Sequence, residues 1–125
     1  MNRVTVAVGL FIAFLVYSLL VYTKGTVSAT VLPKQEAALA NEGKHIFQEY
    51  NCISCHQVYG LGGYLGPELT TAYSDKHRGE AYMNAILRSG GERMPNFHFT
   101  DKQIKAIIAY LKYVDATATP IKTNK

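Results

Sequence analysis

The hydrophobic pattern begins with one long apolar run near the N-terminus. Residues 4–22 contain no charged side chain, and Arg3 and Lys24 flank them. Folded as a helix, this run is ~28 Å long at ~1.5 Å per residue, which is close to the ~30 Å hydrocarbon core of a bilayer. The pattern therefore predicts a membrane-anchoring helix within residues 1–24.

A cleaved signal peptide is the alternative for the same run. Val27-Ser28-Ala29 has the small side chains of a cleavage site, but the apolar region of a signal peptide usually has only ~7–15 residues. We therefore expect the anchor to be retained. The positive-inside tendency of Arg3 favours a cytoplasmic N-terminus, although Lys24 weakens the bias. The rest of the chain is then expected to be exported.

Three later segments show the 3.6-residue period of amphipathic helices. The first, residues 34–50, begins after Pro33 and places Gly43, Phe47 and Tyr50 on one face. Glycine is costly inside a helix. Gly43 therefore indicates that a second helix crosses there at close range.

The last helical segment, residues 100–115, opens with a capping box formed by Thr100 and Gln103. Its other face carries Ala106 and Tyr110, which are predicted to cross the first helix. The apolar stripe of this segment consists of Ile104, Ile107, Ile108, Leu111 and Val114.

The middle segment, residues 79–89, is stopped by Gly90-Gly91. Its sequence predicts Met83 in the core. The same period places Tyr82, Ala85, Ile86 and Ser89 on one face of this helix. No strand-like alternation stands out, so the fold is predicted to be all-α, with a single N-terminal transmembrane helix followed by a helical domain. The expected boundaries are an anchor at 1–24, a linker at 25–33, a domain at 34–116 and a loose tail at 117–125.

Composition and charge narrow the class of function. The chain has 125 residues, 48% of them hydrophobic, and a formal net charge of +4. That length allows at most one ordinary domain beside the anchor. The positive charges form no basic stripe and no nucleic-acid-binding motif is present, which argues against a nucleic-acid partner. The hydrophobic core of a domain of this size gives only marginal stability unless a cross-link or a bound cofactor adds to it.

The most specific chemical signal is the segment Cys52-Ile53-Ser54-Cys55-His56, which contains the only two cysteines of the sequence. C-x-x-C-H is the pattern of a covalent haem attachment site. Each thiol can add to one vinyl group, and the two intervening residues span the gap between the vinyls. His56 then faces the iron and supplies a neutral imidazole nitrogen. The motif predicts one covalent haem c, which would also staple the small domain.

Three other interpretations of this motif compete with haem. A structural zinc site needs four N or S ligands, usually from two clusters, and the sequence has no second cluster. A thioredoxin-like redox pair needs a surrounding βαβ pattern, which is missing. A disulfide across two residues would leave His56 without a role. The context therefore favours covalent haem.

A glycine-rich segment follows the motif. Four glycines within residues 60–66 exclude a regular helix, while Tyr64 and Leu69 make the segment too apolar for a simple flexible loop. The carbonyl of Pro67, or of a neighbour, is expected to accept the second ring N–H of His56 and fix the imidazole. We therefore expect Tyr64, Pro67 and Leu69 to surround the haem.

Met94 precedes Pro95 in a segment that cannot be helical through the proline. On an extended strap its thioether can approach the iron from the face opposite His56, and Met/His ligation is a standard electron-transfer arrangement. A core-filling methionine is the alternative, and His98 is the rival ligand. The two remaining histidines, expected on the solvated surface, are His45 and His77.

The order of these features resembles the class I cytochromes c over residues 34–116. A closer resemblance is to the cytochrome c subunit of bacterial nitric oxide reductase, a family that also has a single N-terminal anchor. The residues that carry this resemblance are Asn51-Cys52-Ile53-Ser54-Cys55-His56, Gly60, Gly62-Gly63-Tyr64, Pro67-Glu68-Leu69 and Arg93-Met94-Pro95-Asn96-Phe97.

The resemblance implies specific site residues and partners. His56 and Met94 would be the axial ligands, and a calcium ion (Ca2+) at the subunit interface would take the carbonyl of Gly62 and the side chain of Tyr64. The implied partners are a large integral-membrane catalytic haem subunit and a soluble periplasmic donor, either a cytochrome or a cupredoxin. The haem domain would lie on the periplasmic side of the bacterial inner membrane. The chain would carry electrons for a respiratory enzyme without being catalytic itself.

Three alternatives for the function stay open. The chain could serve an oxygen-reducing haem–copper oxidase or another respiratory complex. It could be a free-standing, membrane-tethered or secreted electron shuttle. It could also be an enzyme with a five-coordinate haem, such as a peroxidase, in which case Met94 would not be a ligand.

Overall fold

The computed structural model describes residues 2–25 and 32–118. The chain divides into two compact units, Met1–Thr30 and Val31–Lys125. Most of the linker predicted at 25–33, including the cleavage-site sequence Val27-Ser28-Ala29, lies outside the described residues, and so does most of the tail predicted at 117–125.

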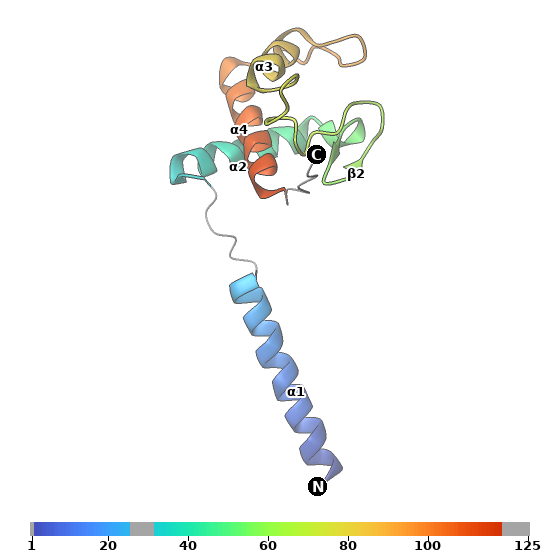
Figure 1. Ribbon diagram of the computed structural model, residues 1–125, viewed down its shortest axis with the longest axis vertical. Helices are drawn as coiled ribbons and strands as arrows, with labels where there is room; N and C mark the ends of the chain where they lie inside the picture. The colour runs from blue at the N-terminus through green and yellow to red at the C-terminus, as the bar shows by residue number, and fades with distance from the viewer. Residues whose placement is uncertain (1, 26–31, 119–125) are drawn as a thin grey trace. The chain divides into compact units, whose positions relative to one another are not determined.

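The first unit is the helix α1 (Arg3–Leu20), continued by the π-helical turn η1 (Val21–Gly25). Figure 1 draws it in blue. Among the described residues, the span Arg3–Lys24 is the one helix that is long and apolar enough to cross a membrane, with a mean hydropathy of 2.6 and no burial inside the protein. Such a large exposed apolar surface requires a non-aqueous environment or a partner.

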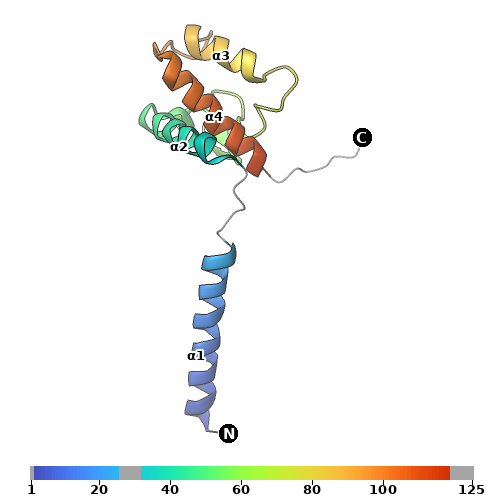
Figure 2. The same cartoon turned by 90° about the vertical axis from the view of Figure 1, so that its left-hand side faces the viewer.

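The second unit is built on the crossing of α2 (Lys34–Glu49) and α4 (Asp101–Thr117), which is visible in Figures 1 and 2. A Cβ placed on Gly43 would lie 1.9 Å from the backbone oxygen of Ala106. The rings of Phe47 and Tyr110 also meet, with centroids 5.4 Å apart. The predicted close crossing at Gly43 is therefore confirmed.

The capping box at the start of α4 is also confirmed. The backbone N–H of Gln103 donates to the hydroxyl of Thr100, and the backbone N–H of Thr100 donates to Oε1 of Gln103 at 2.9 Å. These two bonds satisfy backbone donors that a helix start would otherwise leave unpaired.

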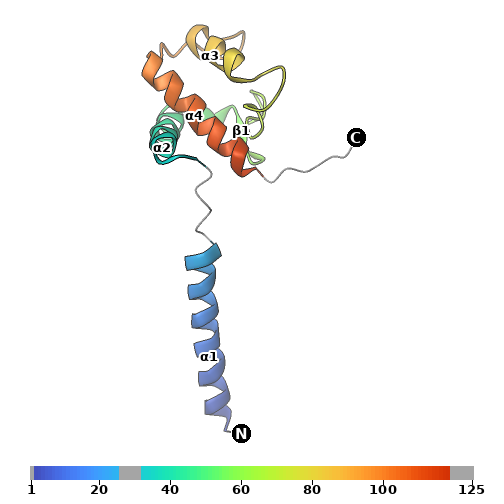
Figure 3. The same ribbon diagram turned by 60° about the vertical axis from the view of Figure 1, so that its left-hand side comes forward.

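The helix α3 (Glu80–Ser89) packs on the other side of α4, so that α4 lies between α2 and α3 (Figures 2 and 3). Met83 is buried, as predicted, and Leu87 is buried beside it. Of the four residues expected together on one face, Tyr82, Ala85 and Ser89 are exposed and Ile86 is half-buried, so the core lies against a different face. Periodicity gives the spacing of a helical stripe, but contact with α4 selects which stripe is buried.

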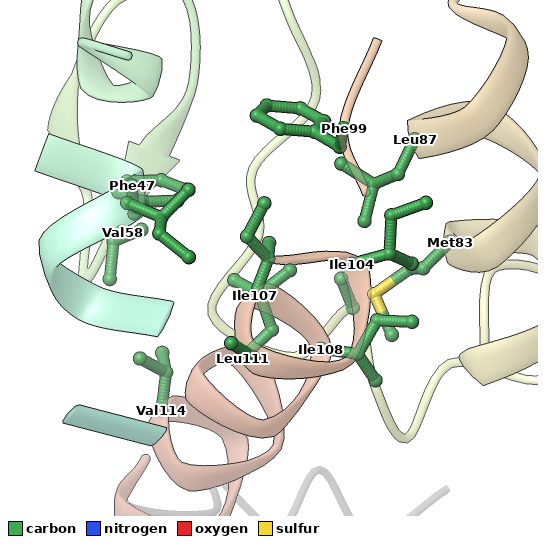
Figure 4. Close-up of a cluster of buried hydrophobic side chains, with 13 residues drawn as sticks. Phe47, Val58, Met83, Leu87, Phe99, Ile104, Ile107, Ile108, Leu111 and Val114 are labelled. Atoms are coloured by element: carbon green, nitrogen blue, oxygen red, sulfur yellow. The ribbon is translucent and has the colours of Figure 1, made fainter. Parts of the chain in front are cut away.

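The hydrophobic core forms around the apolar stripe of α4 (Figure 4). Ile104 and Val114 are almost completely buried, and each such side chain stabilises the fold by about 1.5–3 kcal/mol relative to an exposed one. The other elements contribute Phe47, Val58, Met83, Leu87 and Phe99 to this core.

A short hairpin not predicted from the sequence follows the Cys-x-x-Cys-His segment. Strands β1 (Gln57–Val58) and β2 (Leu61–Gly62) pair antiparallel, with Val58 opposite Leu61. Both turn residues, Tyr59 and Gly60, have positive φ angles of 55° and 74°, as in the tight turns that suit two-residue hairpins. Strands this short leave no periodic signal in a sequence.

Candidate functional site

An apolar cavity of about 390 Å³ opens in the second unit, a size typical of small-molecule sites. Its walls come from the end of α2, the segment after it, α3, the strap before α4, and α4 itself. Cys52, Cys55, His56 and Met94 all line it. The structure thus brings together four residues that the sequence separates by up to 42 positions.

The two cysteines lie on the 3-10 turn η2 (Cys52–Ser54) and just after it. The chain leaves α2 through Asn51, whose φ of 52° is left-handed, and then closes on the carbonyl of Cys52, which accepts the N–H of His56 at 2.9 Å. Both thiols are free and half-buried. Burial raises the pKa of the Cys52 thiol to about 11, so the group is neutral at physiological pH and suits an apolar wall.

The imidazole of His56 is oriented by the carbonyl oxygen of Pro67, 2.8 Å from Nδ1. A carbonyl can only accept, so Nδ1 carries a proton, and in the neutral imidazole Nε2 then keeps its lone pair. This is the tautomer that a metal ligand requires. The hydrogen bond is the one expected from the position of Pro67 in the sequence.

The glycine-rich segment folds back onto the Cys-x-x-Cys turn. The N–H of Gly66 donates to the carbonyl of Cys55 at 2.8 Å, and the N–H of Gly63 donates to the carbonyl of Ile53 at 2.9 Å. A Cβ on Gly63 would lie 1.9 Å from the carbonyl oxygen of Ser54. The absence of side chains at these positions therefore allows the loop to lie directly against the turn.

Met94 reaches the cavity from the strap between α3 and α4. Its carbonyl accepts the N–H of Gly91 at 2.8 Å, and Gly90 turns the chain with a φ of 73°. His98 is exposed and does not belong to the residues lining the cavity. Of the two candidate ligands in this strap, the structure brings Met94 to the cavity.

A cluster of aromatic side chains forms part of the cavity wall. Tyr50 packs edge-on against Phe99, with ring centroids 4.7 Å apart, and against Phe97, with centroids 5.6 Å apart. Such pairs are worth about 0.5–1.5 kcal/mol beyond simple area burial. Tyr50 and Phe97 also line the cavity, and Phe99 is buried in the hydrophobic core. The three packed rings therefore connect the cavity wall to the core.

The remaining predicted residues divide into two groups. Leu69 and Pro67 line the cavity. Tyr64 is 89% exposed and is not among the lining residues, so the structure does not bring it to the pocket expected for it. Gly62 is exposed beside it, with a φ of 131°. His45 and His77 are exposed, as expected.

Sequence reasoning missed several residues of the cavity wall. Tyr82 and Ile86 line the cavity, although the sequence placed them only on a shared helix face and not in the site. Arg78 also lines it, although it stands in a polar run that is typical of a solvated surface. The one signal that could have identified Arg78 is its position directly before the predicted helix.

The donor set fits a covalently bound haem. Two thiols, an imidazole whose Nδ1 is bonded to the Pro67 carbonyl, and a thioether line the same cavity, and most of the lining is apolar. Within residues 2–25 and 32–118, no three His, Cys, Asp or Glu side chains form a metal-binding cluster.

Comparison with known proteins gives relatives of two kinds. The chain is 31% identical over 85 residues to the C subunit of nitric oxide reductase from Halomonas halodenitrificans, covering 58% of this chain and 57% of the relative. It is 27% identical over 86 residues to the protein of the same name from Stutzerimonas stutzeri, covering 62% and 59%. The chain therefore spans less than two thirds of the length of these relatives. It is also 31% identical over 88 residues to "Cytochrome c oxidase subunit 2" of Alkalihalophilus pseudofirmus, covering 59% of this chain and 25% of that relative.

A family model covers most of the second unit. The model described as "Cytochrome C oxidase, cbb3-type, subunit III" matches residues 38–111, a range that contains both cysteines, His56, Met94 and the α2–α4 crossing. The chain therefore belongs to this family and carries its cytochrome c domain.

Proposed function

We propose that this chain is a membrane-anchored monohaem c-type cytochrome that serves as the electron-transfer subunit of a nitric oxide reductase. The observation that carries the proposal is the convergence of Cys52, Cys55, His56 and Met94 on one apolar cavity. The relatives named as C subunits of nitric oxide reductase support the choice of complex.

Each residue of the cavity has a defined role in this proposal. The thiols of Cys52 and Cys55 would hold the haem covalently, each adding S–H across one vinyl group, so that one S–C and one C–H bond replace the S–H bond and the vinyl π bond. Nε2 of His56 and the thioether of Met94 would hold the iron. When bound, a haem supplies an iron that carries one electron at a time between its ferrous and ferric states. Pro67 keeps the imidazole in its ligand tautomer, and Leu69 lines the cavity.

The proposed route of electrons needs two partners. A soluble periplasmic carrier, a cytochrome or a cupredoxin, would deliver single electrons to this chain, and the chain would pass them to a haem in a large integral-membrane catalytic subunit. The apolar helix Arg3–Lys24 supports anchoring in the same membrane. If His56 and Met94 both hold the iron, no position would remain open for a substrate, so the chain is proposed to be non-catalytic.

We further propose that the loop around Gly62 and Tyr64 contacts the catalytic subunit through a shared Ca2+ ion. The exposure of both residues supports a contact outside this chain rather than within it. A carbonyl and a phenol oxygen are ligands of the kind that calcium takes, and the partner would supply the remaining oxygens.

A second candidate is the electron-entry subunit of an oxygen-reducing haem–copper oxidase. The description of the matching family and the relative named cytochrome c oxidase subunit 2 favour it. The cavity would have the same role in that complex, because the chemistry of electron entry does not depend on the final acceptor.

Affinity purification of the full chain from detergent-solubilised host membranes tests the proposal. Recovery of a large partner with b-type haem that consumes NO under reducing conditions supports nitric oxide reductase, whereas O2 consumption supports the oxidase. Recovery of a monodisperse monomer with only c-type haem would reduce the proposal to a tethered shuttle. A Cys52→Ser/Cys55→Ser variant is the control, since it should carry no covalent haem.

A further inference from the structure

The tight turn of the β1–β2 hairpin contains a tyrosine in a backbone conformation that tyrosine rarely adopts. Tyr59 has a φ of 55°, and a positive φ is an outlier for a bulky side chain. Two-residue hairpin turns favour asparagine, aspartate or glycine before the second glycine. The side chain of Tyr59 is also 51% exposed. Neither backbone preference nor core packing therefore explains a tyrosine at this position.

The phenol hydroxyl of Tyr59 makes a contact that gives the side chain a role. Its oxygen lies 2.6 Å from Oγ1 of Thr117 and 3.2 Å from the carbonyl oxygen of Val114, both at the C-terminal end of α4. Thr117 directs its own proton to carbonyls of its helix, among them that of Tyr113 at 2.9 Å, so the phenol is the donor between the two hydroxyls. Tyr59 thus joins the hairpin to a helix that is distant in the sequence.

The backbone of Tyr59 is bonded to the loop that orients the His56 ring. Its N–H donates to Oγ1 of Thr70 at 2.6 Å. Two residues closer to His56, the carbonyl of Gln57 accepts the N–H of Leu69 at 2.9 Å. The strand that follows His56 is therefore bonded to the loop just beyond the carbonyl that accepts the imidazole N–H. Any shift of this strand relative to α4 would be passed to the ring through both segments.

We propose that Tyr59 is a positioning residue for the His56 imidazole. The bond between Tyr59 and Thr117 ties the strand after His56, and the loop bonded to that strand, to α4. This helix also contributes Ile107 and Leu111 to the cavity lining, so the bond fixes the ring relative to the opposite part of the site. Partners beyond the direct ligands orient a ligating imidazole in this way. The inference rests on the proposed function, because the ring orientation has a consequence only when Nε2 holds an iron.

Removal of single hydroxyl groups tests the proposal in the full, haem-loaded protein. Tyr59→Phe and Thr117→Val each delete one partner of the bond, whereas Thr117→Ser keeps a hydroxyl and should preserve it. Tyr113→Phe is the matched control, because Tyr113 is an exposed tyrosine near the same end of α4. The readouts are the solvent-exchange rates of the His56 Nδ1 proton and of the core amides, measured by NMR, and the electron paramagnetic resonance g-values of the ferric protein.

We expect the His56 Nδ1 proton to exchange about two- to tenfold faster in Tyr59→Phe and in Thr117→Val, the factor that corresponds to the loss of one net hydrogen bond. The g-values should shift in both variants. Thr117→Ser and Tyr113→Phe should match the wild type. The double variant Tyr59→Phe/Thr117→Val should exchange no faster than either single variant, since both changes delete the same bond.

Three results would overturn the proposal. The first is wild-type exchange and g-values in both deletion variants. The second is an equal acceleration of every core amide, which would mean that Tyr59 contributes only to general stability. The third is additive effects in the double variant, which would mean that the two hydroxyls act separately. If Tyr59→Phe takes up no haem, Thr117→Val decides by the same exchange and g-value criteria. Absence of c-type haem from the wild type would instead refute the proposed function.

Discussion

Gly66 lies flat against the imidazole of His56. A Cβ on residue 66 would stand 2.4 Å from Cε1, 2.5 Å from Nδ1 and 2.9 Å from Nε2 of that ring. Real Cβ atoms do not approach other atoms this closely, so the ring and the loop fit together only because residue 66 has no side chain. The ring is thus held by the Pro67 carbonyl at its edge and by the Gly66 backbone against its face.

Gly66→Ala should therefore displace the His56 ring or the loop. We expect a loss of about 1–3 kcal/mol of stability from overpacking, together with altered electron paramagnetic resonance g-values of the ferric protein, which report the imidazole orientation. Gly79→Ala is the matched control, because a Cβ there would meet its nearest atom at an ordinary 3.4 Å. Unchanged g-values in a loaded Gly66→Ala protein would contradict the predicted contact.

Gly43→Ala should destabilise the second unit despite the higher helix propensity of alanine. Propensity alone would stabilise α2 by about 1 kcal/mol, but the new Cβ would lie 1.9 Å from a backbone oxygen of α4, and overpacking of this kind costs about 1–3 kcal/mol or more. Denaturant titration measures the balance. Asn41→Ala, at an exposed position of the same helix, should be neutral or slightly stabilising; a gain from Gly43→Ala would mean that the helices cross elsewhere.

Met94→Ala should remove the methionine–iron charge-transfer band of the ferric protein and lower the reduction potential, since a thioether favours ferrous iron. His98→Ala is the control and should leave both unchanged, because His98 is outside the cavity lining. Optical spectra and redox titration of the purified protein measure these effects. A resting spectrum that survives Met94→Ala would favour the five-coordinate, peroxidase-like alternative.

Asp75 predicts a pH-dependent contribution to stability. Hydrogen bonds from the His77 N–H, and then from Arg78, hold the pKa of this carboxyl below its ordinary value of 3.8. A depressed folded-state pKa stabilises the protein above the unfolded pKa, and this contribution is lost as the pH falls through the folded value. Asp75→Asn should therefore lower the melting temperature at pH 7, and the difference from wild type should close at pH values below the folded pKa.

The control for Asp75 is Glu42→Gln. Glu42 pairs with Lys102 at 2.9 Å, but the Lys102 side chain is 76% exposed, and exposed pairs contribute little. Melting curves across the acid range should show a smaller difference for this variant at pH 7. Equal differences for the two variants at every pH would show that Asp75 acts only through general surface charge.

Tyr64→Ala should weaken association with the catalytic subunit without changing the reduction potential, because Tyr64 is exposed and away from the cavity. Tyr113→Ala, another exposed tyrosine of the same unit, is the control. Pull-down yield measured with and without a calcium chelator checks the prediction. A shifted potential with normal association would indicate instead that Tyr64 packs against the haem.

The sequence by itself was sufficient wherever a signal lies within a few consecutive residues or follows one helical period. The Cys52–His56 motif is local, because the spacing of two thiols and an imidazole is set by adjacent residues. The capping box at Thr100 is local for the same reason. The glycine at position 43 indicated a close helix crossing because its cost in a helix requires a reason, and the structure has that crossing at Ala106.

Only the tertiary structure decided which side chains of a helix face the core and which side chains line the cavity. The period of α3 allowed more than one buried stripe, and packing on α4 selected Met83 and Leu87. The polar run before α3 indicated solvent, yet the carbonyl of Glu68 and the carboxylate of Asp75 hold Arg78 at the wall. Such choices depend on contacts between segments far apart in the chain, and no local pattern of side chains encodes the position of a distant carbonyl.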